Sequence, residues 1–119
     1  MTEINYRQLG ITNIVVPEIC IGTSPLGGMP DAYGYDVSRE EALLAMRAVF
    51  ASPITFVDTS NEYSRGESER RIGTAVKEAG GLPEGFVLAT KIDPAEGAES
   101  LPGERVRAFL AESLDRLGV

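Results

Sequence analysis

Three residues with acid–base side chains follow apolar segments that have the character of buried strands. Asp58 lies in ITFVDT, Tyr63 follows five residues later in NEYSRG, and Lys91 ends FVLATK. A carboxylate, a phenol and an ammonium can hold, donate or accept protons at a reacting group. The carboxyl ends of strands in a parallel sheet meet at one edge, where loops carry functional residues. We therefore expect Asp58, Tyr63 and Lys91 to lie near one another.

Each of these residues, taken alone, also has an ordinary structural interpretation. A tyrosine in a polar loop is often a partly exposed packing residue, and a lysine after a strand is often a solvated end. Asp58, which precedes Thr59 and Ser60, could instead accept hydrogen bonds from the amides of a turn. The combination of all three residues at the ends of neighbouring strands favours catalysis.

The elements that would position these residues alternate between strands and helices. Apolar runs predict buried strands over 19–22, 54–59 and 86–91. Helical spacing of apolar residues predicts helices over 38–51, 67–79 and 104–117, the last carried by Val106, Phe109, Leu110, Ser113, Leu114 and Leu117. Ser38 with Glu41 has the form of a capping box, and Gly80 suits a left-handed cap after the second helix.

Two further segments flank the first strand. YRQLG and NIVVPE, joined through GITN, predict a β-hairpin. The Gly- and Pro-rich stretch 22–37 is long for a connection and is therefore either functional or mobile. Its Tyr33 and Tyr35 either line a substrate mouth or belong to mobile surface.

The order of elements indicates an α/β fold with a parallel sheet, because the strands read as buried on both sides. An open doubly wound sheet should carry G-x-G-x-x-G in its first strand-to-helix turn, and GTSPLGG does not have that spacing. We therefore expect the N-terminal portion of a (β/α)8 TIM barrel, with the hairpin as a plug over its amino end.

Composition narrows the possible partners. Eleven basic and eighteen acidic residues give a net charge of −7 without a basic run, which argues against nucleic acid and anionic membrane surfaces. No apolar stretch is long enough for a membrane span, and the first residues lack signal-peptide character. The single Cys20 reads as a small buried thiol, which indicates a cytoplasmic location. Histidine is absent, so we expect no metal site.

The charged segment RGESERR predicts a solvated helix start. Glu67 and Glu69 would lie near the positive end of the helix dipole, and Arg70 and Arg71 would follow on the surface. We therefore expect these charged side chains to be mostly solvated.

Taken together, YRQLGITNIVVPEICIGTSPLGG, FVDTSNEYSRGESERRIG and LATK, in this order and spacing, resemble the N-terminal part of the aldo-keto reductases. Within that family the chain is most similar to bacterial aldose dehydrogenases, which act on fucose or threo-aldoses, and to relatives that act on pyridoxal. The resemblance implies a (β/α)8 barrel, which needs about 250 residues. Residues 1–119 would then be an incomplete part of a single domain, and we expect this segment alone to be inactive.

The resemblance also implies a catalytic group and a cofactor. The family's Asp, Tyr and Lys correspond to Asp58, Tyr63 and Lys91, while its His and its phosphate-binding loops would lie beyond Val119. The cofactor would be NADP or NAD, with Gly22, Thr23 and Asp58 near its nicotinamide. Gly22 can equally be read as a turn glycine.

This group would support hydride transfer between the nicotinamide and a sugar or other small carbonyl compound. Hydride transfer to a carbonyl leaves negative charge on oxygen, so a proton donor is needed. A free phenol, with a pKa of about 10, is a weak donor, and a nearby ammonium favours the phenolate. Tyr63 would be the acid or base, Lys91 the ammonium, and Asp58 the group that keeps Lys91 charged. The alternative is a non-catalytic, cofactor-binding regulatory subunit of the same fold.

Overall fold

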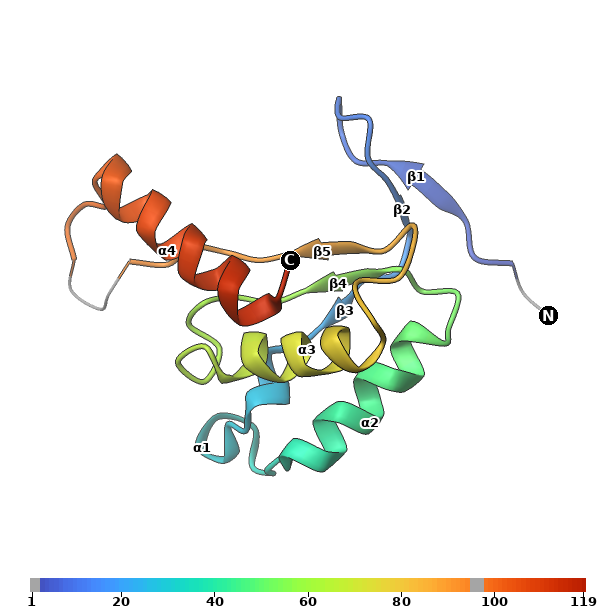
Figure 1. The fold of residues 1–119 in the computed structure, drawn as a ribbon, viewed down its shortest axis with the longest axis horizontal. Coiled ribbons are helices and arrows are strands. Elements are labelled where there is room, and N and C mark those ends of the chain that lie inside the picture. The colour runs from blue at the N-terminus through green and yellow to red at the C-terminus, as the bar shows by residue number, and fades with distance from the viewer. Residues whose placement is uncertain (1–2, 95–97) are drawn as a thin grey trace.

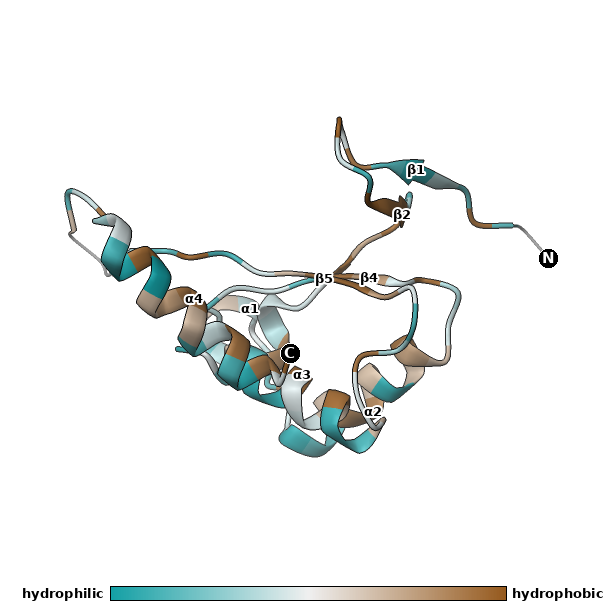
Figure 2. Ribbon diagram, turned by 45° about the horizontal axis from the view of Figure 1, so that its top comes forward, coloured by the Kyte–Doolittle hydropathy of each residue, from teal (hydrophilic) through white to brown (hydrophobic). Residues whose placement is uncertain are grey.

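The computed structural model of the chain describes residues 3–94 and 98–119. Three strands form a parallel sheet in the order β3 (Ile21–Gly22), β4 (Phe56–Asp58) and β5 (Val87–Ala89). The strands alternate with helices α2 (Arg39–Phe50), α3 (Glu67–Glu78) and α4 (Gly103–Leu117), which lie on one side of the sheet (Figures 1 and 2). The predicted strand–helix order and parallel pairing are confirmed.

The hairpin stands at the amino end of the sheet. Strands β1 (Tyr6–Gln8) and β2 (Val15–Pro17) pair antiparallel, and the chain then enters β3. The hydroxyl of Tyr6 donates to the carbonyl of Pro53, just before β4, at 2.8 Å. The hairpin therefore lies at the end opposite the carboxyl ends of the strands, as predicted (Figure 1).

The core lies between the sheet and the helices. Val57 of β4 is fully buried and packs against α2 and α3. The buried cluster comprises Leu43, Met46, Val57, Ile72, Ala75, Val76, Phe86 and Leu117. The helical stripes predicted for α2 and α3 supply most of these side chains, because residues three or four apart share one face of a helix.

The predicted helix caps are present. The hydroxyl of Ser38 accepts from the Glu41 amide, and the Glu41 carboxylate accepts from the Ser38 amide, which completes the capping box of α2. Gly80 follows the cap of α3 with a φ of +82°, in the left-handed region that glycine adopts without strain. Local sequence thus sets where α2 begins and α3 ends.

Three predictions of burial were wrong. The strands are covered on one face rather than two, because the described helices pack only on one side of the sheet, and all of β5 is half-buried. Cys20 lies before β3 and is exposed. On α4, Ser113 and Leu117 are buried, whereas Val106, Leu110 and Leu114 are exposed. The amino-terminal part of the helix, with Val106, extends past α3, and Leu114 lies on a face of the last turn that α3 does not cover.

The long stretch after β3 is structured. It contains a 3-10 turn, η1 (Ser24–Gly27), and a short helix, α1 (Pro30–Tyr33). Arg71 of α3 holds both ends of this region, since its Nη1 donates to the carbonyls of Leu26 and Val37 at 2.8 Å each.

No helix in the described ranges is both long and apolar enough to cross a membrane.

Helices α3 and α4 approach closely at Gly73. A Cβ at this position would lie 1.9 Å from the carbonyl oxygen of Arg116, which is backbone and cannot rotate away. The lack of a side chain at Gly73 is therefore what allows the end of α4 to pack against α3.

We predict that Gly73→Ala destabilises the natural protein by at least about 1–3 kcal/mol, since the new methyl group overpacks a backbone contact. The matched control is Gly103→Ala at the start of α4, where the nearest atom to the new Cβ is a mobile Arg107 nitrogen at 3.8 Å. The control should change the free energy of unfolding by about 0.5 kcal/mol or less. Denaturant unfolding of both variants checks this, and equal stability would contradict the close-packing account.

Candidate active site

The register of the sheet places Gly22, Asp58 and Ala89 side by side at the carboxyl ends of the three strands. Gly22 pairs with Asp58, and Asp58 pairs with Ala89. Side chains alternate between the two faces of a strand. Because Val57 faces the helices, Asp58 points to the open face of the sheet, and Lys91, two residues beyond Ala89, points the same way.

Lys91 lies at the centre of the predicted group. Its Nζ donates to Oδ2 of Asp58 at 2.7 Å, to the carbonyl of Thr59 at 3.0 Å and to the hydroxyl of Tyr63 at 3.1 Å. The same Nζ lies 4.8 Å from the centroid of the Tyr63 ring. The structure thus brings together the three side chains that sequence reasoning selected.

The contacts of Lys91 also shift its pKa. Partial burial lowers the pKa of the Lys91 ammonium, but the hydrogen bonds and negative charge of Asp58 and Tyr63 outweigh this effect. The net result is a raised pKa for Lys91, so the ammonium form is held at neutral pH. At neutral pH a positive charge therefore lies beside the phenol of Tyr63.

The loop that carries Tyr63 has an unusual backbone. Ser64 and Arg65, which follow Tyr63, have φ values of +51° and +53°, in the left-handed region that non-glycine residues seldom adopt. Such residues cost about 1–3 kcal/mol each and persist only where surrounding contacts hold them. Here the Ser64 hydroxyl donates to the Gly28 carbonyl at 2.8 Å. The phenol is thus presented by a strained, well-anchored turn.

The loops after β4 and β5 are fastened together. The Ser60 hydroxyl donates to Oδ2 of Asp93 at 2.9 Å, and the Asp93 amide donates to Oδ1 of Asn61 at 3.0 Å. The Asn61 amide in turn donates to the Lys91 carbonyl at 3.2 Å. These bonds fix the backbone on both sides of the Lys91–Asp58 contact.

The two residues after the first strand differ in what they present. Gly22 is exposed, and no atom lies within 4 Å of the position that a Cβ would take, so open space lies beside its backbone. Thr23 is buried, and its hydroxyl donates to the Asp58 carbonyl at 2.9 Å. The hydroxyl of Thr23 is thus used in a hydrogen bond within the protein, whereas the backbone of Gly22 is accessible.

Cys20 is not an activated nucleophile. Desolvation first, and the Asp58 carboxylate second, raise the pKa of its thiol, and the Lys91 charge only partly opposes them. The thiol form therefore prevails at neutral pH, and thiolate chemistry is disfavoured.

The prediction of a solvated helix start for RGESERR was wrong for Glu69. Its side chain is fully buried, and its Oε2 accepts from Nε of Arg116 at 2.6 Å. Arg71 is also largely buried. The sequence did hold a signal, since Glu69 precedes Ile72 by three and Val76 by seven residues and so lies on the buried stripe of α3.

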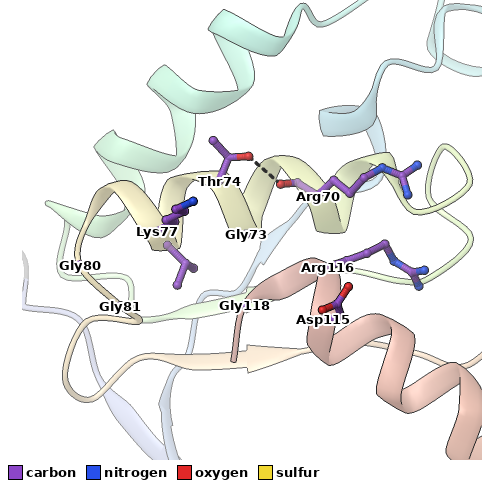
Figure 3. Close-up of a pocket in the computed structure, with 10 residues that line it drawn as sticks. Arg70, Gly73, Thr74, Lys77, Gly80, Gly81, Asp115, Arg116 and Gly118 are labelled. Carbon is purple, nitrogen blue, oxygen red and sulfur yellow. Dashed lines mark hydrogen bonds between the residues drawn. The ribbon is translucent and has the colours of Figure 1, made fainter.

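A groove of about 780 Å³ lies elsewhere, between α3 and α4 (Figure 3). Its walls include Gly73, Thr74 and Lys77 on α3 and Asp115 on α4. The groove lies among the helices and contains none of Asp58, Tyr63 and Lys91. The acid–base group at the strand ends is therefore the better candidate for a reaction site.

Comparison with known proteins identifies a family that this chain matches over most of its length. Residues 18–119 match the family model described as "Aldo/keto reductase family". The chain is 34% identical over 117 residues to L-galactose dehydrogenase of Arabidopsis thaliana, covering 98% of this chain and 35% of that protein. It is 35% identical over 86 residues to pyridoxal 4-dehydrogenase of Microbacterium luteolum, covering 72% of this chain and 23% of that protein.

Solved structures show the same fold. The holo form of an aldo-keto reductase from Bacillus halodurans superposes with a TM-score of 0.78 at 26% identity, covering 98% of this chain and 37% of that chain. An aldo-keto reductase from Klebsiella pneumoniae in complex with NADPH has a TM-score of 0.67 at 26% identity, covering 88% and 32%. The chain thus has the fold of part of a (β/α)8 barrel and spans about a third of the length of the first relatives it matches.

We predict that Asp58→Asn lowers the pKa of Lys91, because the variant loses the negative charge that favours the ammonium. NMR titration of labelled lysine side chains measures this directly, with Lys77 on α3 as the internal reference. The raised pKa means that Lys91 stabilises the folded protein below the unfolded pKa of about 10.4 and loses this effect as pH rises through its folded pKa. An unchanged Lys91 pKa in Asp58→Asn would contradict the described contact.

Proposed function

Because this chain belongs to the aldo/keto reductase family, we propose that the whole protein is an NAD(P)-dependent oxidoreductase. It moves a hydride between a nicotinamide cofactor and a small carbonyl compound or the corresponding alcohol. The observation that carries the proposal is the Lys91 ammonium within hydrogen-bond distance of both Asp58 and Tyr63. This arrangement supplies a proton at the point where hydride transfer creates negative charge on oxygen.

Tyr63, Lys91 and Asp58 have different roles in the proposed reaction. Tyr63 gives its hydroxyl proton to the carbonyl oxygen during reduction and takes a proton from the alcohol during oxidation. Lys91 stabilises the phenolate that forms, because an ammonium 3.1 Å from the Tyr63 oxygen favours the negative form. Asp58 keeps Lys91 charged and directed at the phenol through the 2.7 Å contact. The group therefore acts as one proton relay.

The residues present fit a nicotinamide, which when bound would supply or accept the hydride. The open space beside Gly22 lies in register with Asp58, so a flat ring could rest against the Gly22 backbone beside the relay. Thr23 would support this surface through its hydroxyl contact with the Asp58 carbonyl rather than through its own side chain. The solved relative from Klebsiella pneumoniae is a complex with NADPH, which supports a nicotinamide cofactor and leaves the choice between NADP and NAD open.

We propose a sugar or another small polar carbonyl compound as the substrate. A relative that matches 98% of this chain is named for L-galactose, and another, which matches 72% of it, is named for pyridoxal. The half-buried, polar surroundings of Asp58 and Tyr63 suit such substrates better than a large apolar one. The cytoplasmic location expected from the single cysteine stays a prediction.

We predict that Tyr63→Phe lowers kcat of the natural protein by about 10²–10⁴-fold, the usual contribution of a positioned acid or base. Binding of NADPH or NADH, measured by fluorescence, should be nearly unchanged because only the phenol oxygen is removed. The matched control is Tyr6→Phe in the hairpin, which loses a hydroxyl that contacts Pro53 far from the relay.

Wild-type turnover over a panel of sugars and aldehydes must be measured first. Turnover of Tyr63→Phe close to the wild-type value would contradict the role of Tyr63. Tight nucleotide binding by the wild-type protein without turnover of any compound would instead indicate a regulatory, cofactor-binding subunit.

A further inference from the structure

A threonine follows each strand of the parallel sheet. Thr23 follows β3, Thr59 follows β4 and Thr90 comes directly after β5. Because side chains alternate between faces, each threonine points to the face opposite that of the neighbouring site residue. The residues Gly22, Asp58 and Lys91 thus occupy the open face, while the threonines face the helices.

Two adjacent residues in the first turn of α3 bind all three threonines. The Ser68 hydroxyl donates to the Thr23 carbonyl at 3.0 Å and lies 3.1 Å from the Thr59 hydroxyl. The next residue, Glu69, accepts from the Thr90 hydroxyl through Oε1 at 2.6 Å. One turn of helix therefore holds the carboxyl ends of three strands.

Glu69 is a costly choice for this position unless its charge is compensated. Its side chain is completely buried, and transfer of a carboxylate out of water is strongly unfavourable unless it gains partners. Both oxygens have partners: Oε1 has Thr90, and Oε2 has Nε of Arg116 at 2.6 Å. Arg116 in turn donates to the hydroxyl of Ser113 at 3.3 Å. The carboxylate is thus fixed from α4 on one side and fixes the end of β5 on the other.

The link to the reaction site is covalent and short. Thr90 directly precedes Lys91, so a restraint on the Thr90 side chain sets the direction from which the Lys91 side chain leaves the strand. The Lys91 carbonyl is held separately by the Asn61 amide at 3.2 Å. The Thr90–Glu69 bond adds a restraint perpendicular to the sheet, which hydrogen bonds within the sheet do not provide.

We propose that Glu69 is a positioning residue for the oxidoreductase reaction: by holding the hydroxyl of Thr90, it places the Lys91 ammonium between Asp58 and Tyr63. This inference rests on the proposed function for its kinetic consequence, but the placement of Lys91 can be tested without turnover. Glu69 does not touch the reacting groups, and it acts only through Thr90.

The test removes the hydroxyl of Thr90 in the natural protein. Thr90→Val keeps the shape of the side chain and should lower kcat by about 10–100-fold, the scale expected when a catalytic group is misplaced by about 1 Å. Nicotinamide binding should stay unchanged. The pKa of Lys91, followed by NMR, should fall, because the ammonium moves away from Asp58 and Tyr63.

Two further variants make the result specific. Thr90→Ser retains the hydroxyl and should restore both kcat and the Lys91 pKa toward the wild-type values. Thr74→Val removes a hydroxyl from a half-buried position of α3, where it donates to the Arg70 carbonyl (Figure 3) and contacts none of Thr90, Glu69 and Lys91, and should change neither quantity. If Thr90→Val does not fold, Thr90→Ala replaces it, since the smaller side chain leaves room for a water beside Glu69.

The outcomes separate this proposal from the proposed function. A fall in kcat and in the Lys91 pKa for Thr90→Val, with recovery in Thr90→Ser, supports the positioning role. An unchanged Lys91 pKa in Thr90→Val, or an equal loss in Thr90→Ser, overturns it. If the wild-type protein turns over no carbonyl compound, the proposed function fails, and the Lys91 pKa in Thr90→Val alone decides the positioning role.

Discussion

The contact of one ammonium with a carboxylate and a phenol is the interaction on which the site depends. The Nζ of Lys91 lies 2.7 Å from Oδ2 of Asp58 and 3.1 Å from the hydroxyl of Tyr63. Asp58 ends β4, Tyr63 lies in the loop after β4, and Lys91 follows β5. The hydrogen bonds of Asp58 and Tyr63 and the charge of Asp58 outweigh the effect of partial burial and raise the pKa of Lys91, so this contact strengthens the ammonium form. In the proposed relay, this ammonium is the charge that lies beside the Tyr63 hydroxyl. The strand register, the loop ties and the strained turn after Tyr63 all serve to hold these short distances.

The two faces of the sheet have different roles: the open face carries the site residues, and the face toward the helices anchors the strands. On the open face, Gly22 and Asp58 pair in register, and Lys91 lies two residues beyond Ala89, the partner of Asp58 on β5. On the other face, one turn of α3 binds the threonine after each strand through Ser68 and Glu69. Strand alternation makes this separation automatic, because a residue that anchors the strand is always next to one that faces the site. Rigid support directly behind a reacting group is what limits misplacement to fractions of an ångström.

Local patterns in the sequence predicted the element order, the caps of α2 and α3, and the meeting of Asp58, Tyr63 and Lys91. These features depend on neighbours within a few residues or on the common edge of parallel strands. The place of Glu69 on the buried stripe of α3 could be read from the spacing, but its partner Arg116 lies 47 residues away, and without that partner a buried carboxylate is not expected. The exposure of Cys20 was not predicted for a related reason. An apolar run indicates a buried strand, but it does not show whether another element packs against each of its residues.

The most direct test of the central claim is a double-mutant cycle on the natural protein, with single-turnover rates for Tyr63→Phe, Lys91→Met and the combined variant. If the two side chains form one proton relay, removing the second after the first costs little, and the combined variant is about as slow as the slower single variant. If the two losses multiply instead, Tyr63 and Lys91 act independently, and the account of Lys91 as the group that activates Tyr63 is wrong.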